Sequence, residues 1–264
     1  MYTEDHVHRK VINYTHVNFS NYAHTNFINY AHRGASEYAP ENTFAAFYLA
    51  IEMGANGIET DVRKTLDGKL VLFHDDTITR LIGMNGAIKD FTYEQLLELD
   101  LGSYKSKKYA GEKIVLLDDF LKYFGSRQLN FAIELKDDGI EKDTLEIIYK
   151  YNCQQKSIVT SFSFDRLINI RKFDNEISLG FLTQCVTEDN IKMLLNHNIQ
   201  QICPKAENIN KELVCKAKAS GLSVRAWGVK NVELMEHAYN CGVDGVTVNF
   251  PDKLCELIRR TEEN

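Results

Sequence analysis

The sequence predicts an α/β fold, a (β/α)8 barrel of the TIM type with a loop-rich subdomain inserted after the second strand. Eight apolar or β-branched runs of strand length alternate with segments whose apolar residues recur every three or four positions. The chain of 264 residues also fits one such barrel, which typically needs about 250 residues. A doubly wound open sheet is the alternative. It usually begins with a glycine-rich turn, and His32-Arg33-Gly34-Ala35 lacks that pattern.

The predicted strands follow one another at intervals long enough for a helix. They cover Phe27–Ala31, Gly57–Val62, Asn130–Leu135, Ser157–Ser161, Ser178–Leu182, Gln200–Cys203, Leu222–Trp227 and Asp244–Val248. Helical periodicity fills the intervals: Phe44, Phe47 and Ile51 share one face, after a cap at Asn42 or Thr43. Several helices are expected to end at a left-handed glycine, namely Gly54, Gly221 and Gly242.

Two segments lie outside this alternation. Between Leu70 and Lys113 we predict an insertion, about residues 70–113, with a short strand at Leu70–Phe73 and one short helix at Tyr93–Leu99. Residues 1–26 contain two copies of an eight-residue repeat whose third copy becomes the first strand, and they are predicted to form a loosely held arm. Residues 27–264 are then expected to be a single domain. Four histidines of the arm could alternatively chelate a metal: His6, His8, His16 and His24.

Composition and charge exclude several classes of protein. The formal net charge is −6, which does not favour nucleic acid as a partner. No stretch approaches the roughly 18 apolar residues of a membrane helix, so no membrane anchor is expected. The six cysteines form no C-x-x-C pair and are interpreted as reduced thiols. Because the N-terminus also lacks the apolar core of a signal peptide, we expect a cytoplasmic protein.

Acidic residues concentrate where barrel enzymes place their catalytic groups, at the carboxyl ends of strands. Glu59 and Asp61 lie two apart on one predicted strand, and Glu134 and Lys136 lie two apart on the next, so each pair faces one side. Three carboxylates facing one interior repel each other, and a hard dication such as Mg²⁺ or Ca²⁺ would compensate them. The alternative is a carboxylate network neutralised by basic side chains: Arg63, Arg225 and Lys136.

Two histidines, His32 and His74, each follow directly on a predicted strand near these carboxylates. Their ordinary pKa, about 6.5, suits proton exchange near neutral pH. Arg33 and Lys136 add positive charge. A cation, two histidines and two basic groups together indicate a pocket that cleaves a phosphoester, in which one histidine removes a proton and the other protonates the leaving oxygen.

Short motifs occur in a fixed order along the chain: Ala31-His32-Arg33-Gly34, Ala39-Pro40-Glu41-Asn42-Thr43, Gly57-Ile58-Glu59-Thr60-Asp61-Val62, Leu66-Asp67-Gly68, Phe73-His74-Asp75, Tyr109-Ala110-Gly111-Glu112-Lys113-Ile114, Ile133-Glu134-Leu135-Lys136, Thr160-Ser161-Phe162 and Val243-Asp244-Gly245-Val246. In this combination the sequence resembles the glycerophosphodiester phosphodiesterase family, over about residues 28–258. The resemblance implies a (β/α)8 barrel that hydrolyses glycerophosphodiesters, which are small molecules, to sn-glycerol 3-phosphate and an alcohol.

The resemblance also implies roles for the matching positions. One divalent cation, Mg²⁺ or Ca²⁺, would be held by Glu59, Asp61 and Glu134. The general acid and base would be His32 and His74. Substrate would be bound by Arg33 and Lys136 at the phosphate and by Trp227 as an apolar wall, with Glu41 supporting the site from behind. A hydroxyl of the glycerol would attack phosphorus and give a cyclic phosphate, and the insertion would cap the site.

Two positions depart from the family pattern. Asn249 stands where members often carry aspartate, and we expect it to leave the core roles untouched. Gly228 stands where threonine is usual after the tryptophan, which puts the alcohol preference in question.

Two other functions are alternatives to the hydrolysis of glycerophosphodiesters. A relative acting like lysophospholipase D or phospholipase D at a membrane surface would use a basic cluster in the insertion: Lys105, Lys107 and Lys108. A non-catalytic barrel that binds phosphoesters would be expected to lack a histidine or a metal ligand, and this sequence keeps all five.

Overall fold

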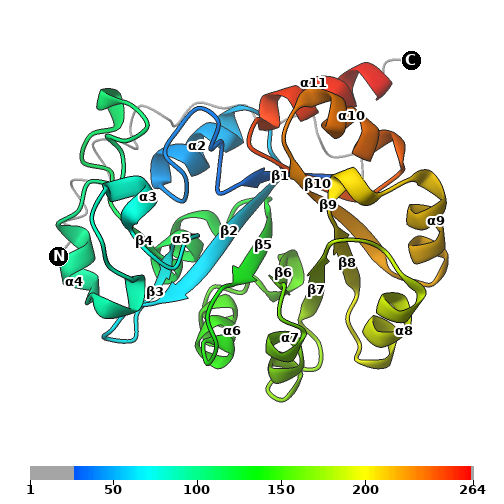
Figure 1. Cartoon of the computed structure of the whole chain (residues 1–264), viewed down its shortest axis with the longest axis horizontal. Coiled ribbons are helices and arrows are strands. Elements are labelled where there is room, and N and C mark those ends of the chain that lie inside the picture. Colours follow the sequence, from blue (N-terminus) through cyan, green and yellow to red (C-terminus); the bar gives the residue numbers. More distant parts are fainter. Residues whose placement is uncertain (1–26, 263–264) are drawn as a thin grey trace.

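The computed structural model describes residues 27–262, so the predicted arm of residues 1–26 and its histidines lie outside the described part of the chain. Within that part, eight parallel strands form a barrel: β1 (Ile28–His32), β2 (Gly57–Lys64), β5 (Asn130–Leu135), β6 (Ser157–Ser161), β7 (Ser178–Thr183), β8 (Gln201–Pro204), β9 (Ser223–Val229) and β10 (Gly245–Val248). Because β1 pairs with both β10 and β2, the sheet closes (Figure 1). The predicted TIM-type barrel is confirmed.

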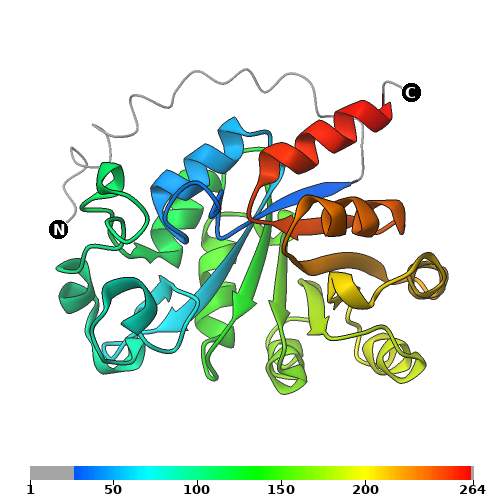
Figure 2. The same ribbon diagram turned by 45° about the horizontal axis from the view of Figure 1, so that its top comes forward.

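Helices cover the outside of the barrel: α2 (Phe44–Glu52), α5 (Leu117–Phe124), α6 (Glu141–Lys150), α7 (Phe164–Arg171), α8 (Glu188–Asn196), α9 (Lys211–Ala219), α10 (Val232–Asn240) and α11 (Pro251–Glu262). Figure 2 shows α11, in red, lying along β1. Of the two predicted caps for α2, Thr43 is the correct one, since its hydroxyl accepts the N–H of Ala46. The Asn42 side chain turns instead toward the barrel and donates to Asp61.

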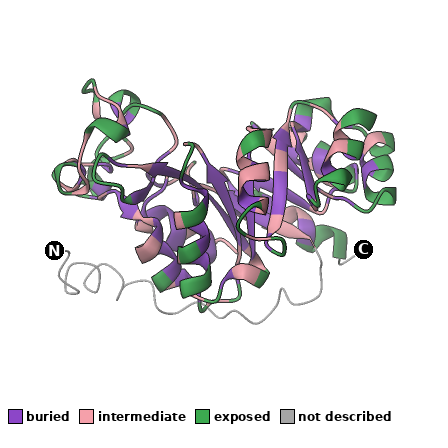
Figure 3. Ribbon diagram, turned by 90° about the horizontal axis from the view of Figure 1, so that it is seen from below, coloured by how far each residue is buried: buried purple, intermediate pink, exposed green. Residues whose placement is uncertain are grey.

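Two large side chains lie in contact inside the barrel. Arg225 on β9 and Tyr30 on β1 are both buried, and the guanidinium lies 5.2 Å from the centre of the Tyr30 ring. Arg225 also donates to Thr247 Oγ1 at 2.7 Å and to Gln201 Oε1 at 3.2 Å. Gly57 makes room for the ring, because a Cβ there would lie 2.7 Å from one of its carbons. In Figure 3 the barrel strands are mostly buried, and exposed residues lie on helices and loops.

The insertion after β2 has a small apolar core of its own. The insertion begins with β3 (Leu70–Leu72), which pairs antiparallel with β2. Its last strand is β4 (Val115–Leu116), which pairs antiparallel with β3. Between them lie α3 (Thr79–Ile82), α4 (Tyr93–Leu97) and two 3-10 turns, η2 (Ile88–Asp90) and η3 (Lys107–Tyr109). Their buried side chains pack together: Val71, Phe73, Ile78, Leu81, Ile88, Leu96, Leu101 and Ile114.

The predicted strand and helix of the insertion are confirmed, with ends one or two residues shorter. The prediction of a single helix there is wrong, because it missed α3. One turn of four residues is too short to show a periodic pattern in the sequence.

Replacing Gly57 by alanine should lower the free energy of unfolding by about 1–3 kcal/mol, because the new methyl group overlaps the Tyr30 ring and the Ile28 side chain. Urea denaturation followed by circular dichroism measures this loss. In a Tyr30→Leu background the same substitution should be less damaging, since the ring is gone. An equal loss in both backgrounds would contradict this explanation.

Candidate active site

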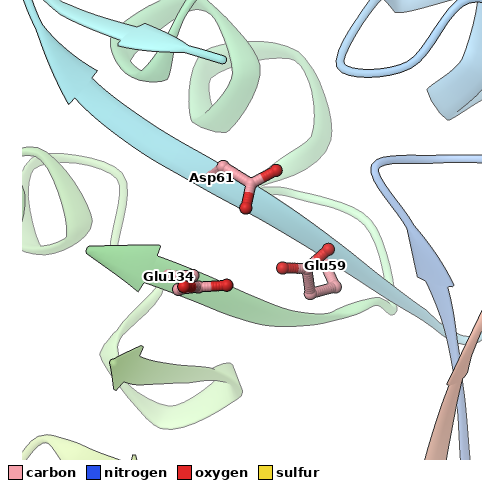
Figure 4. A group of neighbouring side chains, drawn as sticks. All are labelled: Glu59, Asp61 and Glu134. Atoms are coloured by element: carbon pink, nitrogen blue, oxygen red, sulfur yellow. The ribbon is translucent and has the colours of Figure 1, made fainter. Parts of the chain in front are cut away.

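Three buried carboxylates meet toward the carboxyl ends of β2 and β5. Asp61 pairs in register with Glu134, and Glu59 lies two residues earlier on the same side of β2. One oxygen from each of the three lies within 4.8 Å of the others. Figure 4 shows the three side chains facing a common space between the two strands. The structure therefore brings together all three residues predicted as metal ligands, and we call them the acidic cluster.

Two cations and one amide contact the acidic cluster. Lys136 Nζ lies 2.6 Å from Glu134 Oε1 and 3.2 Å from Asp61 Oδ1. Arg33 Nε lies 3.1 Å from Asp61 Oδ2, and Asn42 Nδ2 donates to the same oxygen at 3.1 Å. Burial acts to raise the pKa of Asp61, but Arg33 and Lys136 outweigh it and hold that pKa well below its ordinary value. Asp61 is therefore ionised.

Arg33 and Lys136 do not fully offset burial and mutual repulsion at the other two carboxylates of the cluster. Burial, reinforced by Asp61 and Glu134, raises the pKa of Glu59. Burial also raises the pKa of Glu134, although Lys136 opposes it. Asp61 Oδ1 is completely buried, and its charged neighbour is Lys136 Nζ at 3.2 Å. A donor set made only of carboxylate oxygens fits a hard divalent cation.

The alternative of a purely ionic network accounts for only part of these contacts. Lys136 does contact the cluster, but Arg63 pairs with Asp137 and Asp76, each at 2.6 Å. Arg225 bonds to neutral groups inside the barrel, and no carboxylate of the described residues lies within 4.0 Å of its nitrogens.

His32 ends β1 beside the acidic cluster. Its Nε2 lies 3.9 Å from Glu59 Oε2, and its Nδ1 lies 2.6 Å from Asn249 Oδ1. Since an amide oxygen only accepts hydrogen bonds, Nδ1 carries the proton and Nε2 keeps its lone pair. Burial, followed by the charge of Arg33, lowers the pKa of His32 to about 3, so the ring is neutral at physiological pH.

The expectation that Asn249 leaves the core roles untouched is wrong, because its side chain bonds directly to His32. β1 and β10 pair with Ala31 opposite Val248, so the next residue on each strand is also a neighbour. His32 is the last residue of β1, Asn249 directly follows β10, and these two strands adjoin in the closed barrel. A closed barrel predicts that these two strand ends adjoin, but it does not predict which side chains bond to each other.

His74 follows β3 and is fixed through its ring and its backbone. Its Nδ1 lies 2.6 Å from Asp75 Oδ1, while Arg63 Nε and one Arg63 terminal nitrogen donate to its carbonyl at 3.0 and 2.8 Å. Burial lowers the pKa of His74, and the charge of Asp61 and the bond to Asp75 oppose this shift. A carboxylate stabilises a protonated imidazole, which an amide oxygen does far less. The two histidines therefore differ in the partner at Nδ1.

Glu41 lies behind Arg33 and does not contact the acidic cluster itself. Its Oε1 accepts from an Arg33 terminal nitrogen at 2.8 Å. Arg80, on α3, donates to both oxygens of Glu41 at 2.8 Å and to Asp75 at 2.6 Å. No role for Arg80 is predicted from the sequence, since it follows no barrel strand and lies in a segment expected to be mostly loop.

An aromatic pair lies at the carboxyl ends of β6 and β9. The rings of Phe162 and Trp227 meet edge to face with centroids 4.9 Å apart, and Trp227 Nε1 donates to the Thr183 carbonyl at 3.1 Å. Lys136 Nζ lies 6.0 Å from the Phe162 ring centre, which places the pair beside the acidic cluster. The family resemblance implied an apolar wall at Trp227 but no role for Phe162.

A bulge in β9 sets the direction of Trp227. Val246 on β10 lies opposite Ala226, but Val248 lies opposite Val229, so Trp227 and Gly228 together face one residue. Gly228 has a φ of +74°, in the left-handed region that favours glycine. The departure from threonine at this position thus has a local conformational reason.

Replacing Gly228 by alanine should lower the free energy of unfolding by about 1–2 kcal/mol, because an L residue is strained at this φ. The added Cβ would also press on Lys205 at 3.3 Å. The fluorescence of Trp227, the sole tryptophan, should shift as the bulge relaxes. Gly139→Ala is the matched control, with a φ of +73° and open space around it, so it should lose stability without changing the emission. Identical emission from both variants would contradict the role of the bulge.

Comparison with known proteins identifies the family of this chain. Residues 32–253 match the sequence model of the glycerophosphoryl diester phosphodiesterase family. Over 230 residues the chain is 37% identical to the glycerophosphodiester phosphodiesterase of Caldanaerobacter subterraneus subsp. tengcongensis, covering 85% of this chain and 95% of that relative. A phosphodiesterase structure from Oleispira antarctica, in complex with the product sn-glycerol-3-phosphate, is 28% identical with a TM-score of 0.79, covering 87% and 96% of the two chains. The glycerophosphodiester phosphodiesterase structure from Thermotoga maritima is 26% identical with a TM-score of 0.72, covering 90% and 100%. The chain therefore belongs to the glycerophosphoryl diester phosphodiesterase family.

Proposed function

We propose that this protein hydrolyses glycerophosphodiesters to sn-glycerol 3-phosphate and an alcohol, with one divalent cation as cofactor. The observation that carries the proposal is the buried acidic cluster with His32 at its edge, 3.9 Å from Glu59. Membership of the family supports the same reaction, as does the product bound in the Oleispira antarctica relative.

The acidic cluster, Glu59, Asp61 and Glu134, would hold the cation, Mg²⁺ or Ca²⁺, through carboxylate oxygens. When bound, the cation supplies positive charge that stabilises the phosphate in the transition state. Arg33 and Lys136 are the chain's own cations at the same place, and we assign them to the phosphate oxygens of the substrate.

We assign His32 as the base and His74 as the acid of the first step. Neutral His32, with its lone pair on Nε2, takes the proton of the glycerol hydroxyl beside the phosphate, and that oxygen bonds to phosphorus. The bond from phosphorus to the alcohol oxygen breaks as His74 gives that oxygen a proton. Asp75 supports His74 in its protonated form.

The second step opens the resulting cyclic phosphate with water, and the two histidines exchange roles. His74 takes a proton from the water that attacks phosphorus, and His32 returns its proton to the ring oxygen that leaves. The product is sn-glycerol 3-phosphate, and both side chains regain their starting protonation states. We assign Trp227 and Phe162 to the apolar wall against the glycerol or the alcohol, on the basis of their edge-to-face contact beside the acidic cluster.

The basic cluster of the insertion gives little support to action on lipid at a membrane surface, because two of its three lysines have partners within the protein. Lys105 donates to the Ser36 carbonyl at 2.7 Å, and Lys108 lies 4.5 Å from the Tyr109 ring centre. None of the helices in residues 27–262 has the length and apolar character needed to cross a membrane. The cytoplasmic location expected from the sequence remains a prediction.

The protein should release sn-glycerol 3-phosphate from glycerophosphocholine, glycerophosphoethanolamine or glycerophosphoglycerol, and a chelator should abolish the release until Mg²⁺ or Ca²⁺ is added back. Asp61→Asn should lose cation binding in calorimetry, because it removes the charge at the centre of the cluster. Asp118→Asn, which alters a surface pair with Lys150, is the control and should bind normally. Hydrolysis that survives chelation would refute the need for a metal.

His74→Ala should lower kcat by about 10²–10⁴ for an alcohol leaving group, the usual contribution of a positioned acid. The loss should be much smaller for the p-nitrophenyl diester of glycerol 3-phosphate, because nitrophenolate departs without a proton. His32→Ala should slow both substrates alike, since the attacking hydroxyl still needs a base. His197→Ala, at the exposed end of α8, is the control. If His32→Ala and not His74→Ala spared the p-nitrophenyl substrate, the roles of acid and base would be reversed. Unchanged turnover in both variants would remove both histidines from the mechanism.

A further inference from the structure

Arg80 joins the loop that carries the proposed acid to the loop that carries Arg33. It lies on α3 of the insertion, and its Nε donates to Asp75 Oδ2 at 2.6 Å. Its two terminal nitrogens donate to the two oxygens of Glu41, both at 2.8 Å. Each nitrogen of the guanidinium therefore faces a carboxylate, although 47% of the side chain is exposed to solvent.

Both carboxylates have a second partner inside the proposed site. Asp75 Oδ1 lies 2.6 Å from His74 Nδ1, and Glu41 Oε1 lies 2.8 Å from an Arg33 nitrogen. Arg33 in turn reaches the acidic cluster through its Nε. An unbroken series of contacts with alternating charge thus connects the proposed acid to a proposed metal ligand: His74, Asp75, Arg80, Glu41, Arg33 and Asp61.

The insertion is attached to the loop between β1 and α2 by contacts that do not involve Arg80. The Tyr109 hydroxyl donates to the Tyr38 carbonyl at 3.0 Å, and Lys105 Nζ donates to the Ser36 carbonyl at 2.7 Å. The insertion also has its own apolar core. Because attachment has these other sources, the partners of Arg80 point to a different role.

We propose that Arg80 is a positioning residue for the reaction proposed above, on which this inference rests. Arg80 holds Asp75 against His74 Nδ1, and it holds Glu41 so that Glu41 orients Arg33. Asp75 directly follows His74 and is partly exposed, so without Arg80 its carboxylate can turn toward water. A planar guanidinium binds both oxygens of one carboxylate at once, which an ammonium does not. The insertion therefore contributes a working part of the site.

The first test compares Arg80→Ala, Arg80→Lys and the control Tyr109→Phe, all in the full chain with added metal. Arg80→Ala should lower kcat by roughly 10–100-fold, the range typical of residues that orient a site, with a smaller change in KM. The loss should be larger for an alcohol than for a p-nitrophenyl leaving group, because His74 is affected.

Millimolar guanidinium should restore part of the rate of Arg80→Ala, since Arg80 is half exposed, while ammonium should not. Arg80→Lys should recover little, and Tyr109→Phe should turn over as wild type.

The second test is independent of turnover. Ring ¹⁵N NMR of the metal-free protein, with His74 assigned through His74→Gln, reports which ring nitrogen carries the proton. Wild type and Tyr109→Phe should show His74 with the proton on Nδ1, and Arg80→Ala should shift these signals toward a mixture of tautomers. Unchanged His74 signals in Arg80→Ala, or equal losses in Tyr109→Phe, would overturn the proposal. A wild-type protein without diesterase activity would refute the proposed reaction, and the NMR comparison would still decide the role of Arg80.

Discussion

Placing three carboxylates at one point inside a barrel requires positive charge, and much of this structure supplies it. Arg33 and Lys136 lie against Asp61 and Glu134 from neighbouring strand ends. Below them, the guanidinium of Arg225 is buried beside Tyr30, without a carboxylate in contact among residues 27–262. Because the pKa of Glu59 is still raised, these cations do not fully balance the three carboxylates. A bound dication and an anionic phosphate together would complete this charge balance.

The two histidines of the site differ chemically because they have different hydrogen-bond partners at Nδ1. His32 bonds to an amide that β10 places beside β1, and His74 bonds to the carboxylate of the next residue in the chain. The barrel register produces the first partnership, and local sequence produces the second. An acid–base pair needs one neutral ring with a free lone pair and one protonated ring, and the roles proposed for His32 and His74 follow their different partners at Nδ1. The insertion, through Arg80, bears on the second of these histidines.

Most of the fold and the acidic cluster could be predicted from the sequence, and particular residues show why the rest could not. Glu59 and Asp61 were placed on one side of β2 by simple alternation, and Glu134 joined them because β5 adjoins β2 in register. Asn249 was misjudged because its partner is 217 residues away, and only the pairing of β1 with β10 brings them together. Arg80 was missed because α3 is too short to show a periodic signal. Phe162 directly follows β6, but it was missed because its side chain is not polar. Lys105 was considered for surface contacts, yet it bonds across to Ser36 in the β1–α2 loop.

By itself, the sequence determined which segments are strands, which face of each strand is polar, and which residue types gather at the strand ends. These properties follow from local periodicity and from the rule that parallel strands share a carboxyl edge. The tertiary structure alone decided which polar groups share a hydrogen bond: Asn249 with His32, Arg80 with Asp75 and Glu41, and Lys136 with two carboxylates at once. The two kinds of information differ in the distance along the chain over which they act. Periodicity reports contacts along one element, whereas the pairing of charges depends on distances of a few ångströms between segments that only the closed barrel brings together.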